Sequence, residues 1–322
     1  MRIYSIIVPV YNRPAEIDEL LSSLVNQRYK KFEVLIIEDG STLKCEKEVE
    51  KYKDQLNIQY FYKENSGQGF SRNYGFDKAK GDYFIVFDSD CLIPPLYLQT
   101  VEDQLNQDYL DAFGGPDKAD ASFTLVQKAI NQSMTSFFTT GGIRGKKKHA
   151  GTYHPRSFNM GISRDVYKKT GGYNLTRKGE DIDFSIRIIY AGFKVGLIEE
   201  AYVYHKRRTS LSQFYNQLHF FGRARVNVNR LHPGELKLIH LFPLLFTLGL
   251  PLIAVLIPLL PELGRLVFAV YLLYFLLILL EGTIKNRSIM VGVVAIFSSI
   301  VQLTAYALGM VAEFFSRSKK PQ

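Results

Sequence analysis

Short runs made up mostly of apolar residues punctuate the first two hundred positions of the chain. Ile3–Val10, Phe32–Ile37 and Ile58–Tyr62 have the length and the mostly apolar character of strands in a buried sheet. Stretches with helical periodicity lie between them, such as the leucine stripe that follows Pro14. This alternation predicts an α/β fold with a doubly wound, mostly parallel sheet and right-handed crossovers.

The run Phe84–Phe87 differs from the others because it leads directly into the sequence Asp88-Ser89-Asp90. Ligands of open α/β sheets bind at the carboxyl ends of the strands, and residues two apart on a strand share a face. Asp88 and Asp90 can therefore approach one hard cation, and Mg²⁺ or Mn²⁺ prefers such oxygen ligands. The alternative interpretation is a strand end with two solvated acids.

A glycine-rich loop follows the third predicted strand. Gly67-Gln68-Gly69 begins like a dinucleotide-binding fingerprint, but Arg72 occupies the position of the third glycine. A Rossmann dehydrogenase needs glycine there for close helix–strand packing, so we exclude that class. A glycine loop with an arginine at the start of a helix still suits a diphosphate. A flexible loop with a surface arginine is the alternative.

Leucine, isoleucine, valine and phenylalanine dominate the chain from Leu236 onward. Three apolar stretches follow: Leu238–Leu260, Leu266–Leu280 and Ile289–Ala312. The first and the third have the ~20 residues that cross the hydrocarbon of a bilayer, and the second is short unless flanking residues help. Just before them, apolar residues from Leu211 to Phe221 lie on one helical face, which suits a helix at the membrane interface.

The number of full membrane spans stays open at this stage. Three spans would place the basic tail around Arg317 and Lys319 outside, against the positive-inside tendency. Pro251 and Pro258 allow the first stretch to form a re-entrant or interfacial hairpin, and two spans would then return the tail to the cytosol. We expect an α/β domain at residues 1–210, an interface helix and linker at 211–235, and a membrane domain with two to three transmembrane helices at 236–322.

The charge balance narrows the classes of partner. The chain carries 40 Lys and Arg against 31 Asp and Glu, a formal net charge of +9, with basic clusters at Arg144–His149 and His205–Arg208. Beside an apolar tail, this charge favours membrane lipids or a phosphorylated substrate over nucleic acid. Cys45 and Cys91 have neither metal-site nor disulfide spacing, and the first apolar run is too short for a signal peptide. We therefore expect the α/β domain in the cytosol.

Several motifs together resemble one family. They occur in this order: Ser5–Asn12, Glu38–Ser41, Ser71–Gly75, Asp88–Asp90, Gly171–Tyr173 and Gly179–Asp183. Their sequences and approximate spacing resemble those of the family 2 inverting glycosyltransferases, which have the GT-A fold. Each motif is weak alone, but the series covers most of residues 1–205. The Gln-x-x-Arg-Trp motif of processive synthases is missing, and the chain contains no Trp, which speaks against processive polymerisation.

The resemblance assigns a donor side. Asp39 matches the acid that hydrogen-bonds the base of the nucleotide, and Pro9 and Tyr11 match the walls of the same pocket. Arg72 matches the arginine near the nucleotide diphosphate, and Asp88 matches the acid near the ribose and the metal. An Asp before Gly also commonly caps a turn, which is the alternative for Asp39.

The resemblance also assigns a metal site and a base. Asp90 matches the direct ligand of a divalent metal, Mg²⁺ or Mn²⁺, with Asp88 beside it, and His205 matches a histidine that completes the metal shell in some GT-A enzymes. Asp181 matches the general base and Glu180 its neighbour on the acceptor side. The alternatives are an ordinary histidine at a strand end and an acid that favours a helix N-terminus. Asn159 matches a segment that lines the acceptor side.

These residue types fit one reaction. A divalent ion offsets the charge that builds on a departing diphosphate, and a carboxylate takes the proton of the attacking hydroxyl. We expect a metal-dependent inverting glycosyltransferase at the cytoplasmic membrane, moving a sugar from a nucleotide-sugar donor to a lipid-linked or surface-glycan acceptor. The alternatives are a polyprenyl-phosphate monosaccharide synthase, which the basic loop at 144–149 allows, and a non-catalytic nucleotide-binding scaffold.

Overall fold

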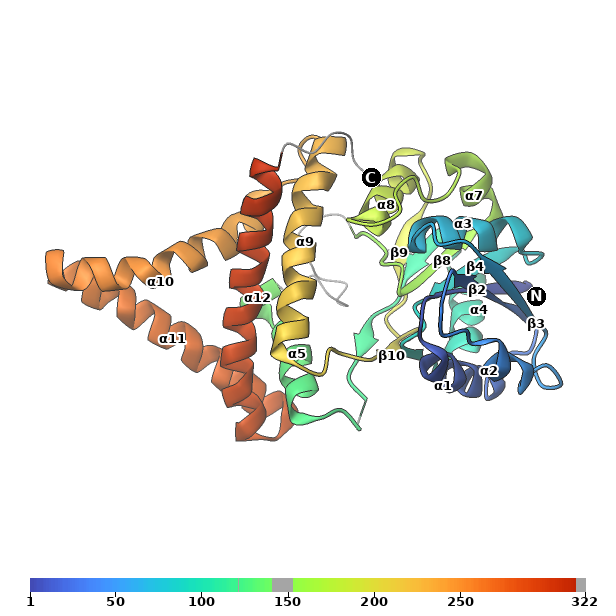
Figure 1. The fold of residues 1–322 in the computed structure, drawn as a ribbon, viewed down its shortest axis with the longest axis horizontal. Coiled ribbons are helices and arrows are strands. Elements are labelled where there is room, and N and C mark those ends of the chain that lie inside the picture. The colour runs from blue at the N-terminus through green and yellow to red at the C-terminus, as the bar shows by residue number, and fades with distance from the viewer. Residues whose placement is uncertain (121, 141–152, 317–322) are drawn as a thin grey trace. The chain divides into compact units, whose positions relative to one another are not determined.

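The computed structural model describes residues 1–120, 122–140 and 153–316 (Figure 1). The basic cluster predicted at Arg144–His149 and the tail after Ser316 lie outside the described residues. The described chain divides into two compact units. The sheet unit comprises residues 1–118 and 153–206, and the helix unit comprises 119–120, 122–140 and 207–316. The sequence did not indicate that the segment around residues 119–140 groups with the C-terminal helices.

A seven-stranded sheet forms the centre of the sheet unit, in the order β3-β2-β1-β4-β8-β6-β9. The strands are β1 (Tyr4–Val10), β2 (Phe32–Asp39), β3 (Ile58–Lys63), β4 (Tyr83–Phe87), β6 (Ala112–Gly114), β8 (Asn159–Ser163) and β9 (Val195–Leu197). Every pair is parallel except those that β8 makes with β4 and β6. The predicted α/β fold is confirmed, and the apolar runs coincide with strands whose residues are buried throughout, as in β1 and β2.

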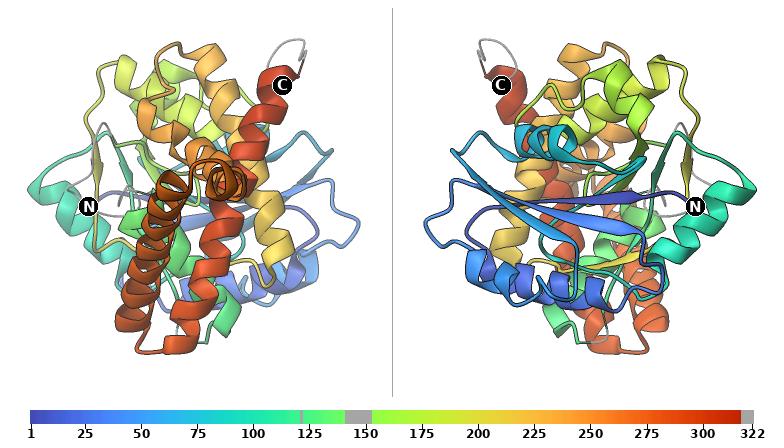
Figure 2. Two further views of the ribbon diagram at one scale, coloured as in Figure 1. Left: turned by 90° about the vertical axis from the view of Figure 1, so that its left-hand side faces the viewer. Right: turned by 90° about the vertical axis from the view of Figure 1, so that its right-hand side faces the viewer.

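Helices cover both faces of this sheet. They are α1 (Pro14–Val25), α2 (Glu46–Glu50), α3 (Gln68–Lys78), α4 (Tyr97–Gln107), α7 (Arg164–Thr170) and α8 (Glu180–Tyr190). Alternate side chains of a strand enter different cores: Ile6 and Val8 pack in the core that contains α1, α2 and α4, and Ile7 packs in the core that contains α3, α7 and α8. Figure 2 (right) shows the first strands with α3 on one side and α1 and α2 on the other.

A second, three-stranded sheet in the order β5-β10-β7 lies in the same unit. Its strands are very short: β5 (Cys91–Leu92), β7 (Asp117–Lys118) and β10 (Val203–His205). β10 pairs antiparallel with β5 and parallel with β7. This pairing brings the end of the sheet unit back beside the residues that follow β4.

The helix unit contains α5 (Leu125–Thr135), α6 (Phe137–Thr140), α9 (Leu211–Leu231), a 3₁₀ turn at Leu238–Leu241, α10 (Phe242–Leu259), α11 (Pro261–Asn286) and α12 (Ile289–Phe315). Three helical segments are long and apolar enough to cross a membrane: Leu238–Leu259, Pro261–Asn286 and Ile289–Phe315. The second reaches this length because the predicted short stretch continues into flanking polar residues. By length and composition, the chain is membrane-associated through these helices.

Candidate active site

The carboxyl ends of β1, β2 and β4 lie at one edge of the sheet because these strands are parallel neighbours. Val10 pairs with Glu38 and Ile7 with Val86, so the ends of these strands lie side by side. Tyr11 follows β1, Asp39 ends β2 and Asp88 follows β4. The side chain of Tyr11 is half exposed, whereas Pro9 within β1 is buried. The predicted donor side is thus assembled at the edge where open α/β sheets bind ligands.

Asp39 is buried at the end of β2 and accepts several hydrogen bonds. Its Oδ1 accepts from Lys63 Nζ at 2.6 Å and from the Ser66 N–H at 2.9 Å, and its Oδ2 accepts from the Gly67 N–H at 2.9 Å. Burial alone would raise the pKa of Asp39, but the hydrogen bonds from Lys63, Ser66 and Ser71 outweigh it and hold this pKa below its ordinary value. A carboxylate has about four acceptor positions, and the hydrogen bonds from Lys63, Ser66, Gly67 and Ser71 account for that number.

Arg72 lies on α3 with its side chain almost completely buried. Its Nη2 donates to Asp88 Oδ1 at 2.8 Å, its Nη1 donates to Glu180 Oε1 at 3.4 Å, and its guanidinium stacks 5.2 Å from the ring centre of Tyr173. The sequence predicted Arg72 at the start of a helix, beside a diphosphate. Its guanidinium contacts both the acid after β4 and the acid at the start of α8, although these carboxylates come from distant parts of the sequence.

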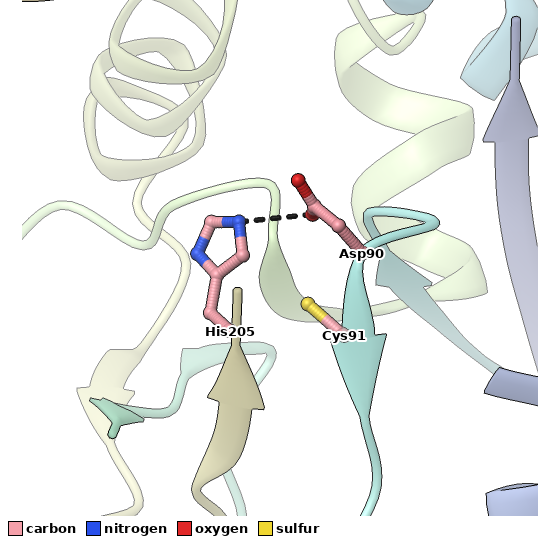
Figure 3. Close-up of side chains that lie close together, drawn as sticks. All are labelled: Asp90, Cys91 and His205. Carbon is pink, nitrogen blue, oxygen red and sulfur yellow. Dashed lines mark ion pairs between the residues drawn. The ribbon is translucent and has the colours of Figure 1, made fainter. Parts of the chain in front are cut away.

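Asp90 and His205 lie together because β5 pairs with β10. His205 stands opposite Cys91 in that pairing, and its Nε2 is 3.0 Å from Asp90 Oδ1 (Figure 3). On the other side of the imidazole, Nδ1 is 3.9 Å from Asp117 Oδ2, and the ring of Phe158 stacks on it at 5.0 Å between ring centres. The resemblance had grouped Asp90 with His205, and the fold places them in contact range.

These residues fit a divalent metal. One oxygen of Asp90, the sulfur of Cys91 and one nitrogen of His205 lie within 4.8 Å of one another. Carboxylate and imidazole suit Mn²⁺, whereas a thiol does not suit Mg²⁺ or Mn²⁺, and burial raises the pKa of the Cys91 thiol. Cys91 lies beside this site because β5 pairs with β10, which places it opposite His205. Asp88 also remains a candidate ligand, but one of its oxygens already accepts from Arg72.

Arg13 contacts the carboxylate of Asp90, and the sequence alone did not identify this arginine as a residue of the site. It follows β1 and directly precedes α1. Its Nη1 donates to Asp90 Oδ2 at 3.2 Å and to Glu16 Oε2 at 2.8 Å. The two oxygens of Asp90 are therefore approached by a fixed cation on one side and by His205 on the other. Arg13 belongs to the Asn12-Arg13-Pro14 turn that follows β1. That position, in a turn at the edge of the sheet, was the feature of the sequence that could have indicated a residue of the site.

Glu180 and Asp181 open α8 but have different surroundings. Glu180 is buried against Arg72 and accepts a hydrogen bond from Gln68 Nε2; burial, and then the charge of Asp181, raises the pKa of Glu180. The side chain of Asp181 is 20% exposed, and its Oδ2 accepts from Arg156 Nη1 at 3.3 Å. Asp181 is thus the more accessible carboxylate of the two.

Asn159 is not available to a ligand. Its side chain is fully buried: Oδ1 accepts from the Tyr97 hydroxyl at 2.5 Å and Nδ2 donates to the Ala201 carbonyl at 2.8 Å. This amide holds β8 to neighbouring segments.

Comparison with known proteins identifies the same family that the sequence motifs resemble. The model of the family described as Glycosyl transferase family 2 matches residues 5–171. A relative in Haemophilus influenzae, an uncharacterized glycosyltransferase, is 30% identical over 218 residues, which is 65% of this chain and 70% of that protein. The chain covers only 13% of the length of a 41%-identical glycosyltransferase from Rickettsia bellii and 30% of one from Rickettsia typhi.

Solved structures show the same fold. The chain is similar to mannosyltransferase PcManGT from Pyrobaculum calidifontis, solved in complex with GDP-Man and Mn²⁺, with a TM-score of 0.70 and 15% identity over 98% of this chain and 88% of that chain. It is also similar to residues 1–349 of Staphylococcus aureus TarS in complex with UDP-GlcNAc, with a TM-score of 0.50 and 23% identity over 70% of this chain and 67% of that chain.

Proposed function

Because the chain belongs to glycosyl transferase family 2 and is therefore a glycosyltransferase, we propose that it moves a sugar, with inversion, from a nucleotide-sugar donor to a lipid-linked or surface-glycan acceptor. The reaction depends on a divalent metal, Mg²⁺ or Mn²⁺. We further propose that the sheet unit faces the cytosol at the cytoplasmic membrane and that the product belongs to the cell envelope. The contact between Asp90 and His205, at the edge where the donor-side residues gather, carries this proposal.

The donor would lie along the carboxyl edge of the sheet. Asp39 would accept a hydrogen bond from the base in place of one of its present donors, and Tyr11 and Pro9 would form the adjoining wall. Asp90 and His205 would hold the divalent ion, with Asp88 beside them. When bound, this ion supplies a Lewis acid that offsets the charge on the leaving diphosphate. Asp117 would keep His205 oriented, as carboxylates behind metal-binding histidines commonly do.

The acceptor hydroxyl would lie against α8. Asp181 is the base in this proposal because it is the accessible carboxylate at the start of α8, beside Arg156. Glu180 lies one residue away but is buried against Arg72. Attack from the face opposite to the leaving diphosphate inverts the anomeric carbon. Arg72 acts as a positioning residue that fixes the acids of both sides.

The comparisons support the donor class. PcManGT is similar over nearly the whole chain and was solved with GDP-Man and Mn²⁺, and TarS was solved with UDP-GlcNAc. A further TarS comparison, 40% identical over 91 residues, is to a poly(ribitol-phosphate) β-N-acetylglucosaminyltransferase. The name of that relative describes transfer to poly(ribitol-phosphate), which is why the proposal includes polymeric acceptors.

Donor binding and hydrolysis by the purified full chain would test this proposal, with UDP-GlcNAc, GDP-Man and related donors, in Mn²⁺ or in chelator. We expect one donor to bind and hydrolyse only with Mn²⁺. Asp90→Asn should lower Mn²⁺ affinity by roughly 10- to 100-fold, whereas Asp165→Asn, at an exposed acid of the same unit, should not. A chain that binds no nucleotide sugar in Mn²⁺, or an Asp90→Asn variant with normal affinity, would contradict it.

The acceptor is found by a second assay. Candidate acceptors, including polyprenyl phosphate and lipid-linked glycans, would be offered with the donor that binds. The anomeric configuration of the product, read by NMR, should be opposite to that of the donor. Retention of configuration would rule out the direct displacement proposed here.

A further inference from the structure

The three apolar helices of the helix unit are not equivalent. In the most apolar window of each, the share of buried residues is 6% for the segment containing α10, 11% for α11 and 44% for α12. Figure 1 shows α10 and α11 projecting as a pair away from α12, while α12 lies along α9. Few residues of α10 and α11 are therefore fully buried, whereas α12 is partly covered by protein.

The contact between α9 and α12 is close along its length. Neither Gly222 on α9 nor Gly309 on α12 has room for a Cβ, because backbone atoms of Tyr306 and His219 of the facing helix occupy that space. Small residues permit this distance of approach. Near the end of α12, Glu313 Oε2 accepts a hydrogen bond from Arg223 Nε of α9 at 2.7 Å. The two helices form one element.

α9 is too polar to accompany α12 through hydrocarbon. It carries three arginines, Arg223, Arg225 and Arg230, besides several Asn and Gln residues. Arg230 reaches the Glu313 carbonyl at 2.7 Å, and Arg225 Nε lies 3.3 Å from the Tyr306 hydroxyl. Charged side chains at the centre of a bilayer are costly, and a spanning α12 would draw these arginines inward with it.

The exposed face of α12 has the pattern of a helix lying on a membrane. Its exposed large apolar residues are Ile289, Met290, Val293, Phe297, Leu308, Val311, Phe314 and Phe315. The opposite face is buried against protein and mixes apolar and small residues, such as Ala295 and Leu303, with the polar residues Ser298, Gln302 and Glu313. Because that face is already covered, α12 can lie in the interface plane with its exposed apolar face directed towards the acyl chains.

The pair α10–α11 has the pattern of a hairpin that crosses. Its uncharged stretches run over 241–260 and 266–280, about 30 Å and about 22 Å of helix. The turn between them carries Glu262 and Arg265, whose side chains are 91% and 69% exposed. Exposed charges do not remain in hydrocarbon, and the long side chain of Arg265 can reach the headgroups. The open end carries Lys285 and Arg287, as the positive-inside tendency favours for the cytosolic side.

We propose that only α10 and α11 cross the bilayer, as a hairpin whose turn reaches the far side. The paired helices α9 and α12 lie in the headgroup region of the near leaflet, with the apolar face of α12 against lipid. Two spans return the chain to the side from which it started, so residue 316 lies on the same side as α9, which follows directly on the sheet unit in sequence.

Cysteine labelling from each side of the membrane tests this topology in the full chain. Glu262→Cys, Ser316→Cys and Lys53→Cys, the last at an exposed position of the sheet unit, would be treated with a membrane-impermeant maleimide in intact cells and in inside-out vesicles. The unsubstituted chain, whose Cys45 and Cys91 are buried, sets the background. We expect Ser316→Cys to label from the same side as Lys53→Cys, and Glu262→Cys only from the opposite side.

Each other labelling result overturns the proposal in a defined way. Labelling of Ser316→Cys from the side of Glu262→Cys would mean that α12 crosses as a third span. Labelling of Glu262→Cys from the side of Lys53→Cys would mean that the hairpin is re-entrant.

Depth measurement tests α12 directly. The chain has no Trp, so Phe297→Trp and Leu273→Trp each introduce a single fluorophore at an exposed apolar position of α12 and of α11. In vesicles of phosphatidylcholine brominated at different acyl carbons, we expect Leu273→Trp to be quenched most by deep bromines and Phe297→Trp most by shallow ones. Equal depth for the two residues would overturn the proposal, because Phe297 lies well inside α12 and would be near the midplane of a span.

Discussion

Two acid clusters lie on either side of Arg72, and they differ in accessibility and in partners. Asp90 is almost buried and is approached by Arg13 and by His205. Asp181 is more open and stands at the start of a helix, with Arg156 beside it. A buried carboxylate beside an imidazole is suited to holding a divalent cation. An accessible carboxylate at a helix N-terminus is suited to receiving a proton from a substrate. Similar side chains thus acquire different chemistry from their surroundings.

Arg72 makes the two clusters depend on each other. One guanidinium pairs with Asp88 on the donor side and with Glu180 on the acceptor side. A shift of either acid would therefore be felt by the other through a rigid, fully buried fork. The comparison predicts that the clusters separate functionally under some substitutions and fail together under others.

The largest effect is expected for Asp181→Asn. Loss of the base should lower transfer by at least ~100-fold, while Mn²⁺-dependent donor binding, which rests on the other cluster, stays unchanged. Turnover and calorimetric donor affinity would be measured on the same preparation, with Asp165→Asn as the control. A variant that loses donor binding would show that the clusters are not separate, and one with normal turnover would move the role of base to another group.

Arg72→Met should damage both clusters together. Removing this guanidinium leaves Asp88 and Glu180 without their shared cation, which we expect to cost about 3 kcal/mol of folding free energy. The midpoint of thermal unfolding and Mn²⁺ affinity should both fall, whereas Arg28→Met, at an exposed arginine of the same unit, should leave them unchanged. An unchanged unfolding midpoint would mean that the ion pairs of Arg72 with Asp88 and Glu180 do not stabilise the fold.

Arg13→Gln should have a smaller effect of opposite sign on the metal side. A unit charge about 4 Å away is worth about 1 kcal/mol in water, so removing Arg13 from Asp90 should tighten Mn²⁺ binding several-fold. Manganese EPR can measure this without any turnover, with Arg28→Gln as the control. Weaker binding would instead assign Arg13 the task of orienting Asp90.

The smallest effect concerns pH. Burial would raise the pKa of Asp39, but hydrogen bonds from Lys63 and Ser66 hold it below its ordinary value. Burial would likewise raise the pKa of Glu102, but hydrogen bonds from Tyr4 and Arg2 hold it below its ordinary value. Each group therefore adds stability above its unfolded pKa, and this is lost as pH falls through the lower folded pKa. We expect the unfolding midpoint to drop below about pH 4.

Glu102→Gln isolates part of this dependence. Glu102 lies away from the acid clusters and contacts Tyr4 and Arg2. The variant should show a shallower loss of stability in acid, by a few degrees in the unfolding midpoint, and unchanged donor binding. An unaltered acid profile would mean that Glu102 does not contribute to it.

Local patterns predicted much of the fold. The mostly apolar runs became β1 to β4, of which β1, β2 and β4 are buried throughout, and Asp88 follows β4 as expected. The contact of Asp90 with His205 depends on β5 and β10, two and three residues long, which leave no periodicity to detect. The pairing of Arg72 with Asp88 and Glu180 was not predicted, because these acids come from segments that only the folded chain brings together.

The helix unit shows the same limit. α5 packs Ala129, Ile130 and Met134 into cores with residues of α9, α11 and α12. Its buried side also includes Gln132 and Ser133, so no continuous apolar stripe marked it as part of this unit. The long apolar helices, in contrast, were visible from composition alone.

The way α5 is interleaved has a practical consequence for truncation. A soluble fragment ending at Lys206 would still contain α5 but none of the helices that cover Ile130 and Met134. It would present a bare apolar helix to solvent and is expected to aggregate on expression. A fragment ending at residue 171, where the family match stops, would also lack Asp181 and His205. Removing the membrane part of this protein therefore requires two excisions rather than one.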